Sequence, residues 1–165
     1  MGRTAALIAV AALALVSIAA AADGGLSLTA NGVVVHAPDD WSRVVVAQSA
    51  RVSDPRTILV AGTHGVAPRA SECQVAAYRI PADGAAVVVL GWRGAASEAL
   101  PRDRSELAGM RLKRPTFECW EGRGAVARIV LRGRAYQVNV MVGDRASRDT
   151  VADALVVARS FGTDD

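Results

Sequence analysis

Short apolar runs separated by turn residues dominate the chain from residue 26 onward, which is typical of an antiparallel sheet. The clearest example is LSLTANGVVVHA, residues 26–37, where two alternating runs flank the hairpin-forming dipeptide Asn31-Gly32. A two-residue turn there pairs Leu28 with Val35 and places the apolar side chains of both runs on one face. This segment therefore predicts a hairpin with one face in the core.

The middle of the chain predicts more strands of the same kind. RVVVAQSARV, residues 43–52, and TILVAG, residues 57–62, each have the composition of a short strand. Residues 74–80 and 85–92 flank a turn at residues 81–84, which predicts a second hairpin. Because the run after this turn begins with an unbroken apolar stretch, we expect it at the centre of the sheet.

The last third of the chain predicts another hairpin. AVARIVLRGRAYQVNVMV, residues 125–142, alternates on either side of the turn Arg132-Gly133. In the register set by that turn, Arg128 faces Gln137, opposite the apolar side chains of both strands. We therefore expect one side of this hairpin in the core and the other in solvent.

The C-terminal segment ASRDTVADALVVARSFG predicts one clear helix. Ser147 is a suitable N-cap, Asp149 suits the first turn, and Gly162 can end the helix. An apolar stripe at helical spacing consists of Val151, Ala154, Leu155 and Ala158. Residues 95–114 lack such a stripe and predict a loop with one or two helical turns. These patterns predict an α+β fold, with a single antiparallel β-sheet of about six or seven strands in a hairpin meander packed by the C-terminal helix.

The N-terminus predicts that the chain is exported. Arg3 precedes an alanine-rich apolar run that ends in Ala20-Ala21-Ala22, small residues that suit a cleavage site. We therefore expect residues 1–22 to be a signal peptide and residues 23–165 to be a single domain, secreted or otherwise extracytoplasmic. The alternative is an uncleaved N-terminal helix that anchors the chain. No stretch of residues 23–165 is long and apolar enough to span a membrane.

The chain has two cysteines, Cys73 and Cys119. An oxidising compartment favours a disulfide bond, and two cysteines can pair in only one way. A metal site would need more ligands than the two histidines, His36 and His64, can add. We therefore expect a structural disulfide bond, no metal and no cofactor.

Few residues are candidates for catalysis, so we expect no enzyme activity. His36 falls on the polar face of the first hairpin and is expected to be exposed. His64 lies between glycines on a predicted loop, and a hydrolase using this histidine is the remaining enzymatic alternative. No serine stands in the G-x-S-x-G pattern of a nucleophile elbow, and no phosphate-binding loop is present.

The formal net charge is +3, and arginine supplies nearly all of the basic side chains. Arg128 and Arg132 are expected on the same face of one strand, with Arg134 at the turn, so these three form a candidate anion-binding surface. A wall polymer, an acidic lipid or an acidic protein would suit such a surface. Nucleic acid is a weaker candidate, because the chain is expected outside the cell and has few aromatic side chains for stacking. The alternative is an ordinary solvated strand face in an arginine-rich chain.

Two segments resemble a known family. LSLTANGVVVHAPDDW resembles the first hairpin of the Mog1/PsbP-like proteins, and RAYQVNVMVGDRASRDTVADALVVARSF resembles their last strand and closing helix. The chain also resembles uncharacterised exported domains of high-GC bacteria, at Phe117, Cys119, Gly133, Arg134 and Tyr136. The resemblance implies an antiparallel sheet covered by helices and a non-catalytic role in binding or assembly, and it transfers no functional residue. We therefore expect a non-enzymatic binding domain whose partner is an envelope protein or an anionic wall polymer.

Overall fold

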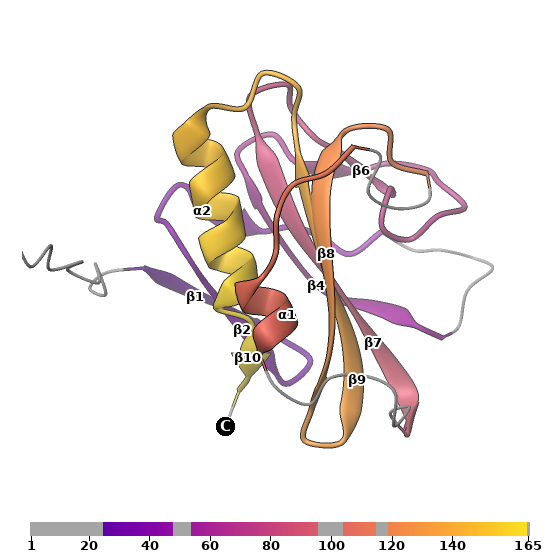
Figure 1. Ribbon diagram of the computed structural model, residues 1–165. Coiled ribbons are helices and arrows are strands. Elements are labelled where there is room, and N and C mark those ends of the chain that lie inside the picture. Colours follow the sequence, from indigo (N-terminus) through magenta and orange to yellow (C-terminus); the bar gives the residue numbers. More distant parts are fainter. Residues whose placement is uncertain (1–24, 48–53, 96–103, 115–118, 165) are drawn as a thin grey trace, which may run out of the picture.

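The computed structural model describes residues 25–47, 54–95, 104–114 and 119–164. Its strands and helices, in chain order, are β1 (Leu26–Ala30), β2 (Val33–Ala37), β3 (Trp41–Arg43), β4 (Arg56–Thr63), β5 (Ala67–Pro68), β6 (Tyr78–Arg79), β7 (Ala85–Ala95), α1 (Ser105–Ala108), β8 (Arg123–Leu131), β9 (Arg134–Val142), α2 (Arg148–Arg159) and β10 (Gly162–Thr163) (Figure 1). Its strands pair antiparallel throughout. The expected α+β class with antiparallel pairing is therefore confirmed. The predicted signal peptide, residues 1–22, lies outside the described residues.

The strands form three sheets, so the prediction of a single sheet is wrong. The largest sheet has five strands in the order β3-β4-β7-β9-β8, another has the order β1-β2-β10, and β5 pairs with β6. The predicted register of the first hairpin is confirmed, with Leu28 opposite Val35. This hairpin does not extend the five-stranded sheet. Instead its apolar face packs against that sheet, together with α2.

A corner after β2 is the physical reason for the separate sheets. The Trp41 N–H donates to the Pro38 carbonyl at 3.0 Å, so the chain turns sharply before β3 begins. β3 then pairs with residues 61–63 of β4 and leaves the plane of the hairpin. Trp41 is buried in the core that the hairpin and the large sheet share. Folding the hairpin over the sheet buries apolar surface that a single continuous sheet would leave exposed.

Two other expectations for the middle of the chain are wrong. The third strand covers Trp41–Arg43 rather than residues 43–52, of which residues 48–52 lie outside the described part. Residues 74–80 form no hairpin with residues 85–92, because the only strand among them, β6, pairs with β5. The strand after the turn, β7, does lie at the centre of the large sheet, as predicted. Since β4 and β9 occupy both edges of β7, no edge remains for β6.

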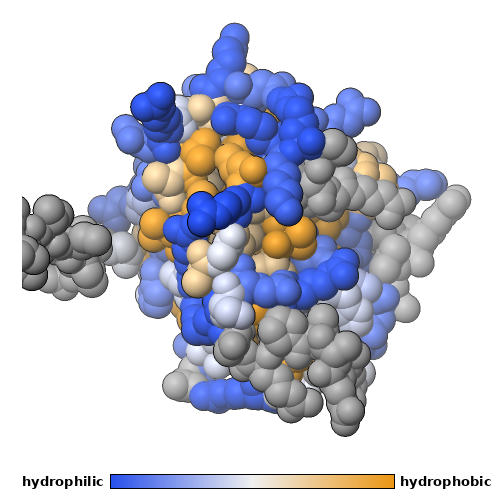
Figure 2. Space-filling view, viewed as in Figure 1, coloured by the Kyte–Doolittle hydropathy of each residue, from blue (hydrophilic) through white to orange (hydrophobic). Residues whose placement is uncertain are grey.

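The first core lies between the large sheet, the first hairpin and both helices. Its largest fully buried side chains are Phe161, Leu59, Leu107 and Ile129. Figure 1 shows α2 packed against the large sheet, with α1 beside the C-terminal end of α2. On this side of the molecule, hydrophobic areas show between hydrophilic side chains (Figure 2). Neither helix of the described residues is long and apolar enough to cross a bilayer.

Helix α2 begins as the sequence predicts but ends differently. The Ser147 hydroxyl accepts a hydrogen bond from the Thr150 N–H at 3.0 Å, which confirms the N-cap. Val157 is fully buried, although the predicted stripe omits it. The prediction that Gly162 ends the helix is wrong. That residue starts β10, which pairs with β2, because the chain continues along the free edge of the first hairpin.

Strand β9 is buried on both faces, so the predicted solvent side of the second hairpin is wrong for this strand. The register is as expected, with Arg128 opposite Gln137, but Gln137 and Asn139 are buried on the other face of the sheet. That face carries a second core, which consists of Val44, Val60, Ala77, Tyr78, Ala86, Val88, Leu90 and Met141. Arg128 Nε donates to Gln137 Oε1 at 2.8 Å, and Gln137 Nε2 donates to Asn139 Oδ1 at 2.9 Å. Asn139 Nδ2 in turn donates to the Val88 carbonyl at 3.1 Å. This row of hydrogen bonds satisfies the buried amides.

The Cys73–Cys119 disulfide bond is present, as predicted, and its Cα atoms lie 6.3 Å apart. It joins the segment before β6, whose Tyr78 packs in the second core, to the residues just before β8. Trp120, next to Cys119, packs against the same core. The bond therefore holds together two segments that cover the second core.

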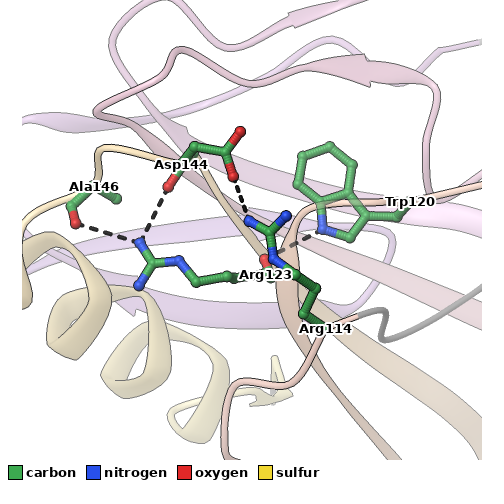
Figure 3. A network of polar contacts seen from close by, with 6 residues as sticks. Arg114, Trp120, Arg123, Asp144 and Ala146 are labelled. Carbon is green, nitrogen blue, oxygen red and sulfur yellow. Dashed lines mark hydrogen bonds and ion pairs between the residues drawn. The ribbon is translucent and has the colours of Figure 1, made fainter.

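A polar network fixes the connection between β9 and α2 (Figure 3). The Arg123 guanidinium donates to the carbonyl oxygens of Gly143 at 3.2 Å and Ala146 at 3.4 Å. Arg114 forms an ion pair with Asp144 at 2.6 Å, but both side chains are largely exposed. Such surface pairs contribute little to stability. The hydrogen bonds from Arg123 to the backbone are therefore the structurally important part of this network.

Tyr78 is fully buried, and its hydroxyl accepts a hydrogen bond from the Ala47 N–H at 3.0 Å. Burial raises the pKa of Tyr78 above 10.0, while hydrogen bonds to Ala47 and Thr57 act in the opposite direction. The folded protein therefore keeps this proton to a higher pH than the unfolded chain, and we expect the free energy of unfolding to fall as the pH rises above about 10. Urea unfolding across the alkaline range measures this effect. A Tyr78→Phe variant should lose stability less steeply there, and equal slopes would contradict the prediction.

Candidate functional site

A cleft of about 420 Å³ opens at one end of the large sheet, where segments far apart in the sequence meet. It is lined by Asn31 of the first turn, by Arg56, Thr57 and Ile58 of β4, by Gly91, Trp92 and Arg93 of β7, and by Arg134 and Tyr136 of β9. The first residues of β4 and β9 and the last residues of β7 come together because these strands are antiparallel neighbours. The cleft is therefore a product of the sheet order.

Two local features shape the walls of the cleft. Asn31 adopts the left-handed conformation that a two-residue hairpin turn requires, with φ 53°. Its Nδ2 donates to the Ile58 carbonyl at 2.7 Å, which fixes the tip of the first hairpin against β4. On β7 the register with β9 shifts after Gly91, so Trp92 and Arg93 leave the regular ladder at the rim of the cleft.

Three arginines, each from a different strand, line the cleft: Arg56, Arg93 and Arg134. All three are exposed, and no aspartate or glutamate is among the described residues that line the cleft. One carboxylate lies close by, since Asp54 Oδ1 accepts a hydrogen bond from the Arg93 backbone N–H at 3.1 Å. The lining itself carries three positive charges, which creates a local potential that attracts anions.

Two aromatic side chains, both fixed by packing, form an apolar part of the cleft wall. The Tyr136 ring packs edge-on against Phe161 of the first core, with the ring centroids 5.3 Å apart and an interplanar angle of 63°. Trp92 is half-buried and packs against the second core. The aromatic surface is therefore held by both cores, while the arginine side chains extend from its rim.

A second hollow, of about 340 Å³, adjoins the cleft and shares Asn31 and Ile58 with it. Its other lining residues are Ala30, Arg43, Val44, Val45, Val46, Leu59 and Val60. Val45 is 75% exposed and Val46 is 36% exposed. An apolar surface that contains one more arginine therefore continues directly from the cleft.

A third hollow, of about 390 Å³, lies beside β8 and has mixed charge. Its lining includes Glu106 as well as Arg111 and Lys113. The Glu106 carboxylate also accepts a hydrogen bond from the Arg128 N–H at 2.9 Å. Because opposite charges compensate there, the arginine-lined cleft is the stronger candidate for a binding site.

The three arginines that the sequence suggests for anion binding do not form one surface. Arg128 lies on the second-core face of β8, where its Nε donates to Gln137. Arg132 lies in the turn, with φ 49°. Arg134 has the same side-chain direction as Tyr136 two residues later, and it lines the cleft. Of the three, Arg134 alone belongs to the cleft.

Neither histidine lines the cleft. His36 is exposed on β2, and its Nδ1 lies 3.0 Å from the Ser27 hydroxyl oxygen. His64 is exposed between β4 and β5 and lines none of the three hollows described above. In the part of the chain that the structure describes, no group of three His, Cys, Asp or Glu side chains could hold a metal ion.

Sequence reasoning missed Arg56 and Arg93. Arg56 lies just before the predicted strand at residues 57–62, and Arg93 lies just after the one at residues 85–92. Antiparallel pairing of these two strands would have placed both arginines at the same end of the sheet. That signal depends on knowing the strand order, which the sequence did not provide.

Comparisons with known proteins add no relatives: no protein-family model, curated protein or solved structure matches the chain. The resemblance to the Mog1/PsbP-like proteins and to exported domains of high-GC bacteria therefore remains an expectation from the sequence.

Proposed function

We propose that the chain is an exported, non-enzymatic domain that binds an anionic ligand in the arginine-lined cleft. The single observation that supports this most is that Arg56, Arg93 and Arg134 converge from three strands on one cleft, and that the lining residues the structure describes include no carboxylate. A guanidinium group presents several N–H donors in a planar fork, which suits phosphate and carboxylate groups. Three such groups around one hollow favour a ligand with more than one negative oxygen.

The dimensions and the walls of the cleft suit a small ligand or the end of a larger one. A volume of about 420 Å³ lies within the usual range for sites that hold a small molecule. Tyr136 and Trp92 offer apolar contact beside the charged rim, so the ligand can be bound through more than its charge. A wall polymer, an acidic lipid and an acidic segment of an envelope protein all carry suitable anions.

Two features support the exported location in this proposal. Residues 1–22 have the pattern of a signal peptide, with an uncleaved anchor as the alternative. The Cys73–Cys119 disulfide bond is favoured in an oxidising compartment. Both features support a location in which polymers and lipids of the envelope are accessible to the cleft.

Calorimetric titration with tripolyphosphate tests the cleft directly. Replacing Arg56, Arg93 and Arg134 by glutamine removes three charges while keeping side chains of similar length. We expect this variant to bind tripolyphosphate about tenfold or more weakly, because charge-assisted hydrogen bonds are lost. Binding to the unmodified protein should also weaken as the salt concentration rises.

A matched control replaces three exposed arginines outside the cleft, Arg79, Arg145 and Arg148, by glutamine. This variant has the same net charge as the cleft variant and should bind tripolyphosphate nearly as well as the unmodified protein. Equal weakening in both variants would show that only the overall charge matters, and the proposed site would be wrong. An Arg128→Gln/Arg132→Gln variant should also bind normally, and weakening there would place the site at the β8–β9 turn.

A further inference from the structure

We propose that the anion is the headgroup of a membrane lipid, and that the protein binds an anionic membrane surface with Val45 and Val46 inserted among the lipids. This inference rests on the proposed function, because the phosphate groups of the lipid are taken to bind in the arginine-lined cleft. It adds a second contact, the apolar hollow beside the cleft. Both contacts together define a lipid-binding surface, which consists of the cleft and the adjoining hollow.

The two hollows form one continuous surface. Asn31 and Ile58 line both, and the hydrogen bond between the Asn31 side chain and the Ile58 carbonyl lies at their boundary. Arginines occur on each side of this boundary, with Arg43 in the apolar hollow. A ligand that contacts the boundary can therefore reach positive charge and apolar surface at the same time.

Backbone hydrogen bonds on both sides of the two valines keep them exposed. Val44 is buried, and its N–H donates to the Val60 carbonyl at 2.9 Å. Three residues later, the Ala47 N–H donates to the buried Tyr78 hydroxyl at 3.0 Å. The backbone is thus held on both sides of Val45 and Val46, which keeps these two side chains at the surface. Adjacent exposed valines beside a binding cleft indicate an apolar partner.

The charges on this surface match an anionic lipid. The two hollows are lined by Arg43, Arg56, Arg93 and Arg134, and within residues 25–47, 54–95, 104–114 and 119–164 no carboxylate lines either of them. Lipid phosphates suit the guanidinium groups, and the adjacent acyl region suits the valines. A hydrophilic wall polymer would use the arginines but would gain nothing from the exposed valines. The combination therefore favours a lipid surface over a soluble polyanion.

An environment-sensitive fluorophore placed at position 45 tests this orientation. A single new cysteine, introduced by Val45→Cys, is labelled while Cys73 and Cys119 remain paired. The label should shift to shorter emission wavelength with vesicles that contain phosphatidylglycerol, and should not shift with pure phosphatidylcholine vesicles. Because the label reports the position of this one side chain, binding of the whole chain through its apolar N-terminal run would not produce the shift.

Val126→Cys is the matched control. Val126 is also partly exposed, at 39%, but it lies on β8, at the opposite edge of the large sheet from β3 and β4. A label there should stay in water on the same vesicles. In the Val45→Cys protein, replacing Arg56, Arg93 and Arg134 by glutamine should abolish the shift. Added tripolyphosphate should reduce it, because both ligands need the cleft.

The outcomes separate this inference from the proposed function. No shift at position 45 in a protein that binds tripolyphosphate would overturn the membrane contact and leave a cleft for soluble or polymeric anions. An equal shift on phosphatidylcholine vesicles would overturn recognition of the anionic headgroup. A shift at position 126 in place of position 45 would overturn the assigned surface. Failure to bind tripolyphosphate would overturn the proposed function itself.

Discussion

A Gly143→Ala variant should lose about 3 kcal/mol or more of its free energy of unfolding, because this position has no room for a side chain. Gly143 is buried where the turn at residues 81–84 contacts the connection between β9 and α2. Its N–H donates to the Gly84 carbonyl at 2.9 Å. A Cβ atom would overlap the backbone carbonyl oxygens of Pro81 and Ala82. Backbone atoms cannot rotate away as a flexible side chain can, so the turn itself must move.

Displacing this turn would break further hydrogen bonds. The Arg145 N–H donates to the Ala82 carbonyl at 2.7 Å, and Arg123 donates to the Gly143 carbonyl at 3.2 Å. Urea unfolding measures the total loss. Gly94→Ala is the control, because a Cβ at Gly94 meets no atom within 4 Å, and its stability should change by about 0.5 kcal/mol or less. If Gly143→Ala were as stable as this control, the close contact would be wrong.

Replacing Cys73 and Cys119 together by serine should destabilise the protein by about 4 kcal/mol. The two residues are 46 positions apart, and a loop of this length gives about that value on the chain-entropy model. The loss should affect the second core first, because the bond joins the segment carrying Ala77 and Tyr78 to the start of β8. Urea unfolding of the oxidised protein and the double variant measures the difference.

Reduction provides the control for the cysteine experiment. A reducing agent should lower the unfolding free energy of the unmodified protein to nearly that of the double-serine variant. The same reagent should leave the double-serine variant unchanged, because that variant has no disulfide bond to reduce. A double-serine variant as stable as the oxidised protein would show that the bond contributes nothing to the folded state.

The hairpins could be predicted from the sequence because their register is set locally. Asn31-Gly32 and Arg132-Gly133 each specify a two-residue turn, and alternation then assigns every side chain of the flanking strands to a face. The disulfide bond and the N-cap at Ser147 also depend on few residues and simple rules. These features needed no knowledge of the rest of the fold.

Contacts between distant segments could not be predicted in the same way. The run around Ala85–Leu90 is apolar on both faces, so its sequence identifies a central strand but not its neighbours. The pairing of β7 with β4 and β9, and the corner after β2, depend on how whole elements cover one another. The cleft arises from that arrangement, which is why Arg134 was identified as a candidate while Arg56 and Arg93 were not.

The amide of Asn139 has a consequence for the alignment of β9 with β7. Up to Gly91, where β7 pairs regularly with β9, the side chains of β7 that face the second core are the aliphatic Ala86, Val88 and Leu90, and a slide of two residues would keep each on its own face. Such a slide would move the Asn139 amide away from the Val88 carbonyl. A buried amide that loses its hydrogen bond in an apolar layer lowers the free energy of unfolding by about 1–3 kcal/mol. One polar group therefore distinguishes the correct alignment from near-equivalent ones that aliphatic packing alone would tolerate.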